Sequence, residues 1–120
     1  MEARPLTVLV VDDEPSIRLL CRVNLELDGF RVLEAASLAE ARAVLAESRP
    51  DAVLLDVHLG TEEGPSLLPE LAGIPVALLT GSVDVNELRR GSAEPVIPKP
   101  FPLELLTSTV RRLVGKDEVA

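Results

Sequence analysis

The chain carries uninterrupted apolar runs that stop at polar residues. The clearest run, Ala52–Leu55, follows a break at Pro50 and leads directly into Asp56. A continuous apolar run of this length is typical of a strand buried on both faces, as in a parallel sheet. The other runs are similar or alternate more strongly. Together the pattern predicts five strands at residues 6–11, 30–35, 52–56, 75–80 and 96–99.

The intervals between the first three predicted strands carry helix signals. Pro15 suits the first position of a helix, where its missing N–H is not needed, and Gly29 provides a stop. Ser37 and Glu40 have the S-x-x-E spacing of a capping box at the start of a second helix. These intervals therefore predict two regular helices.

The later helices are predicted to be less regular. A helix over residues 65–72 contains Pro69, which should remove a hydrogen bond and shorten or kink it. A fourth helix can be capped by Asp84 and Glu87, but Gly91 arrives after about two turns. Pro102 opens the last helix and Gly115 closes it. The third and fourth helices are thus expected to be short.

Strands that alternate with helices in this way predict an α/β fold. The expected architecture is a doubly wound parallel sheet of five strands, with helices on both faces and right-handed crossovers. Pro98 lies inside the fifth strand and cannot donate a ladder hydrogen bond, which favours an edge position for that strand. We expect residues 1–120 to form one domain, with no second domain.

Composition narrows the classes of function. The net charge is −8 and no cluster of Lys or Arg stands out, which argues against nucleic-acid binding. No apolar run approaches the roughly 20 residues of a membrane span, and we expect a cytoplasmic protein. The single cysteine, Cys21, is interpreted as a small apolar residue on the inner face of a helix. Only 2% of residues are aromatic, so the core must be aliphatic.

Five chemically active side chains follow the predicted strands. The carboxyl ends of parallel strands meet at one edge of a sheet, so these residues should share a pocket. Three carboxylates in one pocket repel one another, and an all-oxygen set without a Cys or His cluster suits Mg²⁺. The residues are Asp12 and Asp13 after the first strand, Asp56 after the third, Thr80 after the fourth and Lys99 after the fifth.

This combination favours phosphoryl chemistry. Asp56 can act as a nucleophile that takes a phosphoryl group as an acyl phosphate. Mg²⁺, Lys99 and the Thr80 hydroxyl can neutralise and position the phosphoryl oxygens. Each residue alone also has a plainer interpretation: Asp12 and Asp13 can cap a helix, Asp56 can form a turn, and Lys99 can be a solvated lysine. Those interpretations do not explain why all of them follow strands in this order.

The same motifs resemble those of the receiver domains of two-component response regulators. The resemblance covers about residues 6–114 and implies a flavodoxin-like fold with strand order 2-1-3-4-5. The motifs that carry it are Val10-Val11-Asp12-Asp13-Glu14, Leu54-Leu55-Asp56, Leu79-Thr80-Gly81 and Lys99-Pro100-Phe101, together with Gly64 eight residues after the aspartate.

The resemblance implies a role for each site residue. Asp56 would accept the phosphoryl group from a histidine kinase or a histidine phosphotransfer protein. Asp13, Asp56 and the backbone carbonyl of His58 would bind Mg²⁺ directly, and Asp12 would bind it through water. Thr80 would move toward the phosphoryl group and Lys99, followed by a cis Lys99–Pro100 bond, would pair with it.

The resemblance also implies how such a domain works. A stand-alone receiver would not be an enzyme beyond its own phosphorylation and dephosphorylation. It would act by binding a downstream protein or by passing the phosphoryl group on, as a monomer or a weak homodimer.

The sequence departs from the family pattern at several places. Gly60 stands where the family usually has proline, which predicts a looser loop, and Val96 replaces an aromatic residue that usually changes rotamer. The spans from Asp56 to Thr80 and from Thr80 to Lys99 are shorter than usual. The side chain of His58, with Ser82, is a candidate for tuning dephosphorylation; alternatively, only the His58 carbonyl acts.

Three other functions remain as alternatives. A receiver fold could serve as an interaction module without taking phosphate, although the complete set of site residues weighs against this. A phosphohydrolase with an aspartate nucleophile commonly uses D-x-D-x-T, and Asp56-Val57-His58 lacks the second acid. A flavin-binding flavodoxin-like protein would need a Ser/Thr/Gly phosphate loop after the first strand, where this chain has acids.

Overall fold

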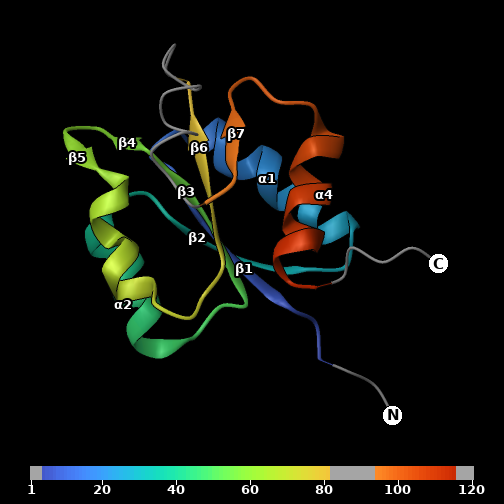
Figure 1. The fold of residues 1–120 in the computed structure, drawn as a ribbon, viewed down its shortest axis with the longest axis horizontal. Helices are drawn as coiled ribbons and strands as arrows, with labels where there is room; N and C mark the ends of the chain where they lie inside the picture. The colour runs from blue at the N-terminus through green and yellow to red at the C-terminus, as the bar shows by residue number, and fades with distance from the viewer. Residues whose placement is uncertain (1–3, 82–93, 116–120) are drawn as a thin grey trace.

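The described residues form a parallel sheet with helices on both faces (Figure 1). The computed structural model describes residues 4–81 and 94–115. The sheet has the order β2-β1-β3-β6-β7, and every neighbouring pair of strands is parallel. The strands are β1 (Thr7–Val11), β2 (Arg31–Ala35), β3 (Ala52–Asp56), β6 (Val76–Thr80) and β7 (Val96–Pro98). The predicted fold class and strand order are confirmed.

Alternate residues of the central strands face opposite layers. Val8, Val10 and Leu54 pack with α1 (Pro15–Leu27) and α4 (Leu103–Leu113). Leu9 and Val53 pack with α2 (Leu38–Glu47) and with the 3₁₀ helix η1 (Gly64–Leu71) on the other face. Figure 1 shows α1 and α4 on one side of the sheet and α2 on the other. Burial of β1 and β3 on both faces explains their unbroken apolar runs.

The predicted helix ends of α1 and α2 are confirmed. Pro15 is the first residue of α1, and Gly29 follows its end with a φ of +93°, a conformation that favours glycine. Ser37 caps α2 by accepting a hydrogen bond from the Glu40 N–H at 3.1 Å. The Glu40 side chain accepts in return from the Ala36 N–H at 2.7 Å.

Two stretches differ from the sequence-based expectation of a plain loop and a poor α-helix. The residues after Asp56 form a short antiparallel hairpin, β4 (His58–Leu59) and β5 (Glu62–Glu63). Gly60 lies in its two-residue turn with a φ of +61°, which glycine adopts without strain. The predicted third helix is the 3₁₀ helix η1, with Pro69 inside it. The predicted fourth helix, with Asp84, Glu87 and Gly91, lies outside the described residues.

Strand β7 is an edge strand, as Pro98 predicted. Thr80 and Pro98 are register partners, and the Lys99 N–H donates to the Thr80 carbonyl at 2.8 Å. The Lys99–Pro100 peptide bond is cis. These contacts fix the start of the chain segment that carries Lys99 beside the end of β6.

Cys21 is a residue of the apolar core. Cys21 is fully buried in the layer between the sheet and α1, and burial raises the pKa of its thiol to about 12. A thiol with such a pKa is inert at neutral pH, which agrees with its interpretation as a core residue.

Within residues 4–81 and 94–115, none of the helices has the length and apolarity needed to cross a membrane.

Candidate functional site

The carboxyl ends of β1, β3 and β7 bring two aspartates and a lysine together. Asp12 directly follows β1, Asp56 is the last residue of β3, and Lys99 directly follows β7. Lys99 Nζ lies 2.7 Å from Asp12 Oδ2 and 3.3 Å from Asp56 Oδ2. Asp12 is fully buried and Asp56 is 4% exposed. The ammonium therefore bridges two buried carboxylates at the edge of the sheet.

Asp12 makes two different contacts with its two oxygens. Oδ1 accepts a hydrogen bond from the Glu14 N–H at 2.9 Å, just before α1 begins. Oδ2 is buried without a well-aligned hydrogen bond and faces the Lys99 ammonium. Asp12 thus orders the turn before α1 and presents a charged oxygen to the site, but it does not cap the helix: the N-cap residue is Glu14, which has no side-chain capping hydrogen bond.

Asp13 and His58 lie at the solvent side of the same cluster. One carboxylate oxygen from each of Asp12, Asp13 and Asp56 can be chosen so that all three lie within 4.8 Å of one another. The His58 N–H donates to Asp56 Oδ1 at 3.3 Å, so the backbone of this residue lies beside the predicted nucleophile. The His58 side chain is 58% exposed, and its Nδ1 lies 3.4 Å from Glu63 Oε2.

Thr80 occupies a more withdrawn position than the other predicted residues. It is 1% exposed at the end of β6, and Gly81, the next residue, lines the cavity beside Asp56. Its backbone carbonyl accepts from Lys99, as described above. The structure therefore places Thr80 at the expected strand end, buried, and next in sequence to a residue that lines the cavity. Ser82 lies outside the described residues.

Burial and charge together raise the pKa of Asp56 to about 6. Loss of solvent is the largest cause and the negative charge of Asp12 adds to it, while Lys99 and the His58 N–H oppose it. For Lys99, burial lowers the pKa, but the hydrogen bonds and charges of Asp12 and Asp56 outweigh this and raise it overall. The cluster thus holds a charged lysine next to an aspartate that ionises below neutral pH.

A cavity of about 580 Å³ opens over Asp56. Its lining includes Asp13, which the sequence predicted as a site residue, and Glu14, for which the sequence predicted no role. Glu14 Oε1 lies 3.5 Å from Lys99 Nζ, and its place directly after Asp12-Asp13 was the signal available in the sequence. The lining residues are Asp13, Glu14, Asp56, His58, Gly60, Gly81 and Lys99.

The donor set fits a hard divalent cation. The three clustered donors, from Asp12, Asp13 and Asp56, are carboxylate oxygens, which Mg²⁺ prefers. Asp12 Oδ2 is a buried anionic oxygen whose close partner is a flexible lysine side chain, so a cation can replace the ammonium as its counter-charge. The chemistry of the residues therefore agrees with the predicted metal site.

Gly64 supports the backbone of Asp56. Its N–H donates to the Val57 carbonyl at 2.8 Å, and a Cβ placed on Gly64 would lie 1.8 Å from the Asp56 carbonyl oxygen. Only a residue without a side chain permits this approach. The family motif had pointed to Gly64, and the structure supplies the physical reason for it.

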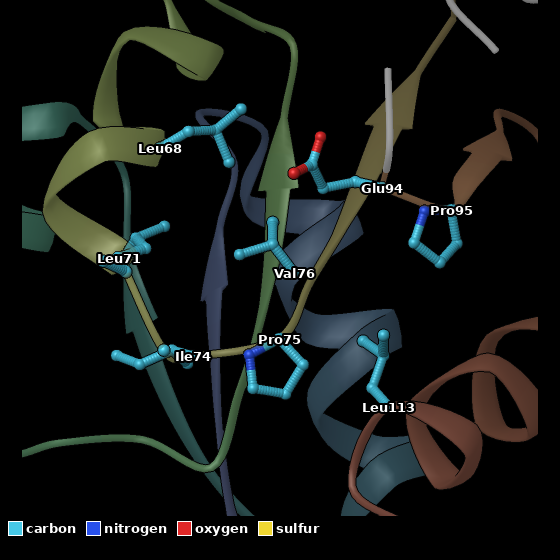
Figure 2. A pocket seen from close by; sticks show the side chains of 10 residues that line it. Leu68, Leu71, Ile74, Pro75, Val76, Glu94, Pro95 and Leu113 are labelled. Atoms are coloured by element: carbon cyan, nitrogen blue, oxygen red, sulfur yellow. The ribbon is translucent and has the colours of Figure 1, made fainter. Parts of the chain in front are cut away.

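A second hollow lies at the opposite edge of the sheet and lacks such chemistry (Figure 2). It has a volume of about 370 Å³ and is lined mainly by apolar residues from η1, from the starts of β6 and β7, and from the end of α4. Glu94 is the one carboxylate among its lining residues. The cavity over Asp56 is therefore the candidate functional site.

Comparison with known proteins places this geometry in a family. The family model of the response regulator receiver domain matches residues 8–111. The chain belongs to the response regulator receiver domain family. The matched range contains β3, β6 and β7, all of β1 except its first residue, and all of the site residues described above.

Relatives of known sequence include response regulators. The chain is 35% identical over 119 residues to the response regulator MprA of Mycobacterium sp. (strain KMS), covering 93% of this chain and 52% of that protein. It is 33% identical over 125 residues to the probable transcriptional regulatory protein TcrX of Mycobacterium tuberculosis, covering 98% of this chain and 53% of that protein. The receiver domain thus spans about half the length of these relatives.

Solved structures agree with the assignment of the fold. A response regulator from Thermotoga maritima superposes with a TM-score of 0.79 at 31% identity, covering 92% of this chain and 98% of that one. The chemotaxis protein CheY4 of Vibrio cholerae superposes with a TM-score of 0.77 at 28% identity, covering 91% and 98%. Both matches extend over nearly the whole receiver domain.

Proposed function

We propose that this receiver domain accepts a phosphoryl group on Asp56, with Mg²⁺ bound, from the phosphohistidine of a histidine kinase or a histidine phosphotransfer protein. The observation that carries the proposal is the position of Asp56. Its carboxylate ends a buried strand, opens into a cavity, and lies 3.3 Å from a lysine ammonium beside two further aspartates. Membership of the response regulator family supports the same chemistry.

The residues of the chain have separate tasks in this reaction. An Asp56 carboxylate oxygen forms the new O–P bond while the P–N bond of the phosphohistidine breaks and its electron pair returns to the imidazole. With a pKa of about 6, Asp56 is mostly ionised at neutral pH and ready to attack. The Lys99 ammonium can stabilise the negative charge that develops on the phosphoryl oxygens, because its flexible side chain already reaches Asp56.

Metal binding is assigned to the acidic residues. Asp13, Asp56 and the backbone carbonyl of His58 would hold Mg²⁺ directly, and Asp12 would hold it through water. The bound cation supplies neutralisation of phosphoryl oxygens that would otherwise be repelled by the acidic cluster. Thr80, which is buried at the end of β6, would move toward the phosphoryl group to contact it.

The consequence of phosphorylation would be a change in protein binding rather than a further reaction. The domain acts on no substrate other than its own Asp56, and the acyl phosphate is lost by hydrolysis or by transfer to another protein. The partners are a histidine kinase or phosphotransfer protein before the reaction and a downstream protein after it, in the cytoplasm. A monomer or a weak homodimer would carry out this cycle.

Intact mass spectrometry tests the proposal directly. The protein is incubated with acetyl phosphate, with and without Mg²⁺, and an adduct of about 80 Da is expected only with the metal. Asp56→Asn should abolish the adduct. Glu47→Gln removes one exposed carboxylate from α2 and should leave it unchanged. An adduct that persists in Asp56→Asn would refute phosphorylation at this residue, and no adduct in the unmodified chain would favour a phosphate-independent interaction module.

A further inference from the structure

The β4–β5 hairpin is fastened to the acceptor site at its base. β4 begins two residues after Asp56, and β5 ends directly before Gly64. The Gly64 N–H bonds to the Val57 carbonyl at 2.8 Å, and Gly64 packs directly on the Asp56 carbonyl. Both ends of the hairpin are therefore held within a residue or two of the phosphoryl acceptor.

The hairpin also contacts the Asp56 carboxylate itself. The first residue of β4, His58, donates its N–H to Asp56 Oδ1 at 3.3 Å. Phosphorylation converts one carboxylate oxygen into the bridging oxygen of an acyl phosphate, and the negative charge then lies on the phosphoryl oxygens instead of the carboxylate. The hydrogen bond from His58 must then weaken or find a new acceptor, because its strength depends on that charge.

The far side of the hairpin is attached to α2. Glu62 Oε1 accepts a hydrogen bond from the Leu38 N–H at 3.3 Å. Leu38 is the first residue of α2, so its N–H has no partner within the helix, and a carboxylate is also favoured there by the helix dipole. Leu59 of β4 and Leu38 are both buried in the same apolar cluster. The hairpin is thus packed and hydrogen-bonded rather than loosely held.

These contacts form a continuous connection of about four steps. It runs from the Asp56 carboxylate to the His58 backbone, across the hairpin pairs His58–Glu63 and Leu59–Glu62, and from Glu62 to the first N–H of α2. A two-residue ladder with a tight turn has little room to deform internally. A displacement of the His58 backbone should therefore be transmitted to Glu62 with little loss of amplitude.

We propose that the β4–β5 hairpin couples the phosphorylation state of Asp56 to the N-terminal turn of α2 through Glu62. The inference rests on the proposed function, because it requires a phosphoryl group on Asp56. The first turn of α2 and the hairpin then form a surface whose shape reports the state of the site. Since coupling is reciprocal, Glu62 also influences how tightly the site holds Mg²⁺ and the phosphoryl group.

Amide NMR spectra of the whole chain, with and without Mg²⁺ and beryllofluoride as a phosphoryl mimic, test the coupling. In the unmodified chain the Leu38 amide signal should shift when the mimic binds. In Glu62→Ala that response should be lost, and the apparent affinity for the mimic should change by about two- to tenfold. Glu62→Gln keeps an acceptor oxygen and should retain most of the response. Glu47→Ala removes an exposed carboxylate from the opposite end of α2 and should leave the Leu38 response intact.

The outcomes separate the inference from the proposed function. The same samples are treated with acetyl phosphate and weighed, and absence of an adduct refutes phosphorylation of Asp56 and the coupling with it. An adduct together with an unmoved Leu38 amide refutes the coupling alone. A Leu38 response in Glu62→Ala equal to that of the unmodified chain also refutes it. Well-dispersed spectra of Glu62→Gln guard against a result that merely reflects unfolding.

Discussion

Lys99 lies closer to Asp12 than to Asp56: Nζ is 2.7 Å from Asp12 Oδ2 and 3.3 Å from Asp56 Oδ2. The lysine is thus shared, with its shorter contact to the more deeply buried acid. A divalent cation that neutralises Asp12 would release Lys99 toward Asp56. The bridge consequently stabilises the metal-free site while keeping the ammonium within reach of a phosphoryl group.

Removing the bridge should be costly. Lys99→Met leaves two buried carboxylates without their counter-charge, and breaking such a pair typically costs about 3–5 kcal/mol of folding free energy. We expect a loss of this order at pH 8 in a chelating buffer, measured by urea unfolding, and partial recovery with Mg²⁺. Arg42→Met breaks the exposed Arg42–Glu70 pair and should cost much less stability, because water screens that pair. Equal losses in the two variants would contradict the bridge's role.

The raised pKa of Asp56 predicts a pH-dependent stability. Its folded pKa of about 6 lies above the ordinary value of 3.8, so the fold favours the protonated form. The contribution of protonated Asp56 to the free energy of unfolding is complete below about pH 3.8 and is lost as the pH rises through about 6. Without metal, Asp56→Asn should therefore stabilise the protein by about 1–3 kcal/mol at pH 8 and by much less at pH 4.5. Urea unfolding at both pH values measures this, and a difference that does not change with pH would refute it.

Magnesium should stabilise the unmodified chain against heat. A ligand at 100 times its dissociation constant adds about 2.7 kcal/mol when it binds only the folded state. We expect the melting temperature to rise with Mg²⁺ concentration, and to rise much less in Asp13→Asn and Asp56→Asn. Sodium chloride at matched ionic strength controls for general screening. An equal rise with both salts would show that no specific site is filled.

Gly64 should tolerate no side chain. In Gly64→Ala the new Cβ would meet the Asp56 carbonyl oxygen at 1.8 Å, so the backbone of the acceptor must move. We expect a loss of about 2–4 kcal/mol in stability and slower phosphorylation by acetyl phosphate. Gly60→Ala is the matched control: it also changes a glycine of this region, with nothing within 4 Å of the added Cβ.

The control variant carries its own expectation. Gly60 has a φ of +61°, so Gly60→Ala should cost about 1–2 kcal/mol through backbone strain alone. Its rate of phosphorylation should stay close to that of the unmodified chain. If Gly60→Ala slowed phosphorylation as much as Gly64→Ala, the close approach of Gly64 to Asp56 would not be the cause.

The sheet and its active edge could be predicted because their signals are local and strong. Unbroken apolar runs mark β1 and β3, and Asp12, Asp56 and Lys99 follow strands whose order is fixed by parallel topology. The hairpin was missed for the opposite reason. Strands of two residues carry no periodicity, and this pair depends on the positive φ of Gly60 and on the distant contact between Glu62 and Leu38.

The contacts of individual side chains in the site could not be predicted from the sequence either. Lys99 was expected to pair with the phosphoryl group, and nothing in the pattern indicated that it would contact Asp12 and Glu14 in the metal-free state. The burial of Thr80 at the end of β6 likewise depends on tertiary packing. Such preferences arise from three-dimensional burial and charge, which strand periodicity does not encode.

Strand β7 has one more consequence. It is three residues long, it lies at the edge of the sheet, and its last residue, Pro98, has no N–H to offer. A second polypeptide that paired with this edge would find few backbone hydrogen-bonding groups, because the strand is short and ends in a proline. The strand that precedes Lys99 is therefore a poor template for edge-to-edge aggregation.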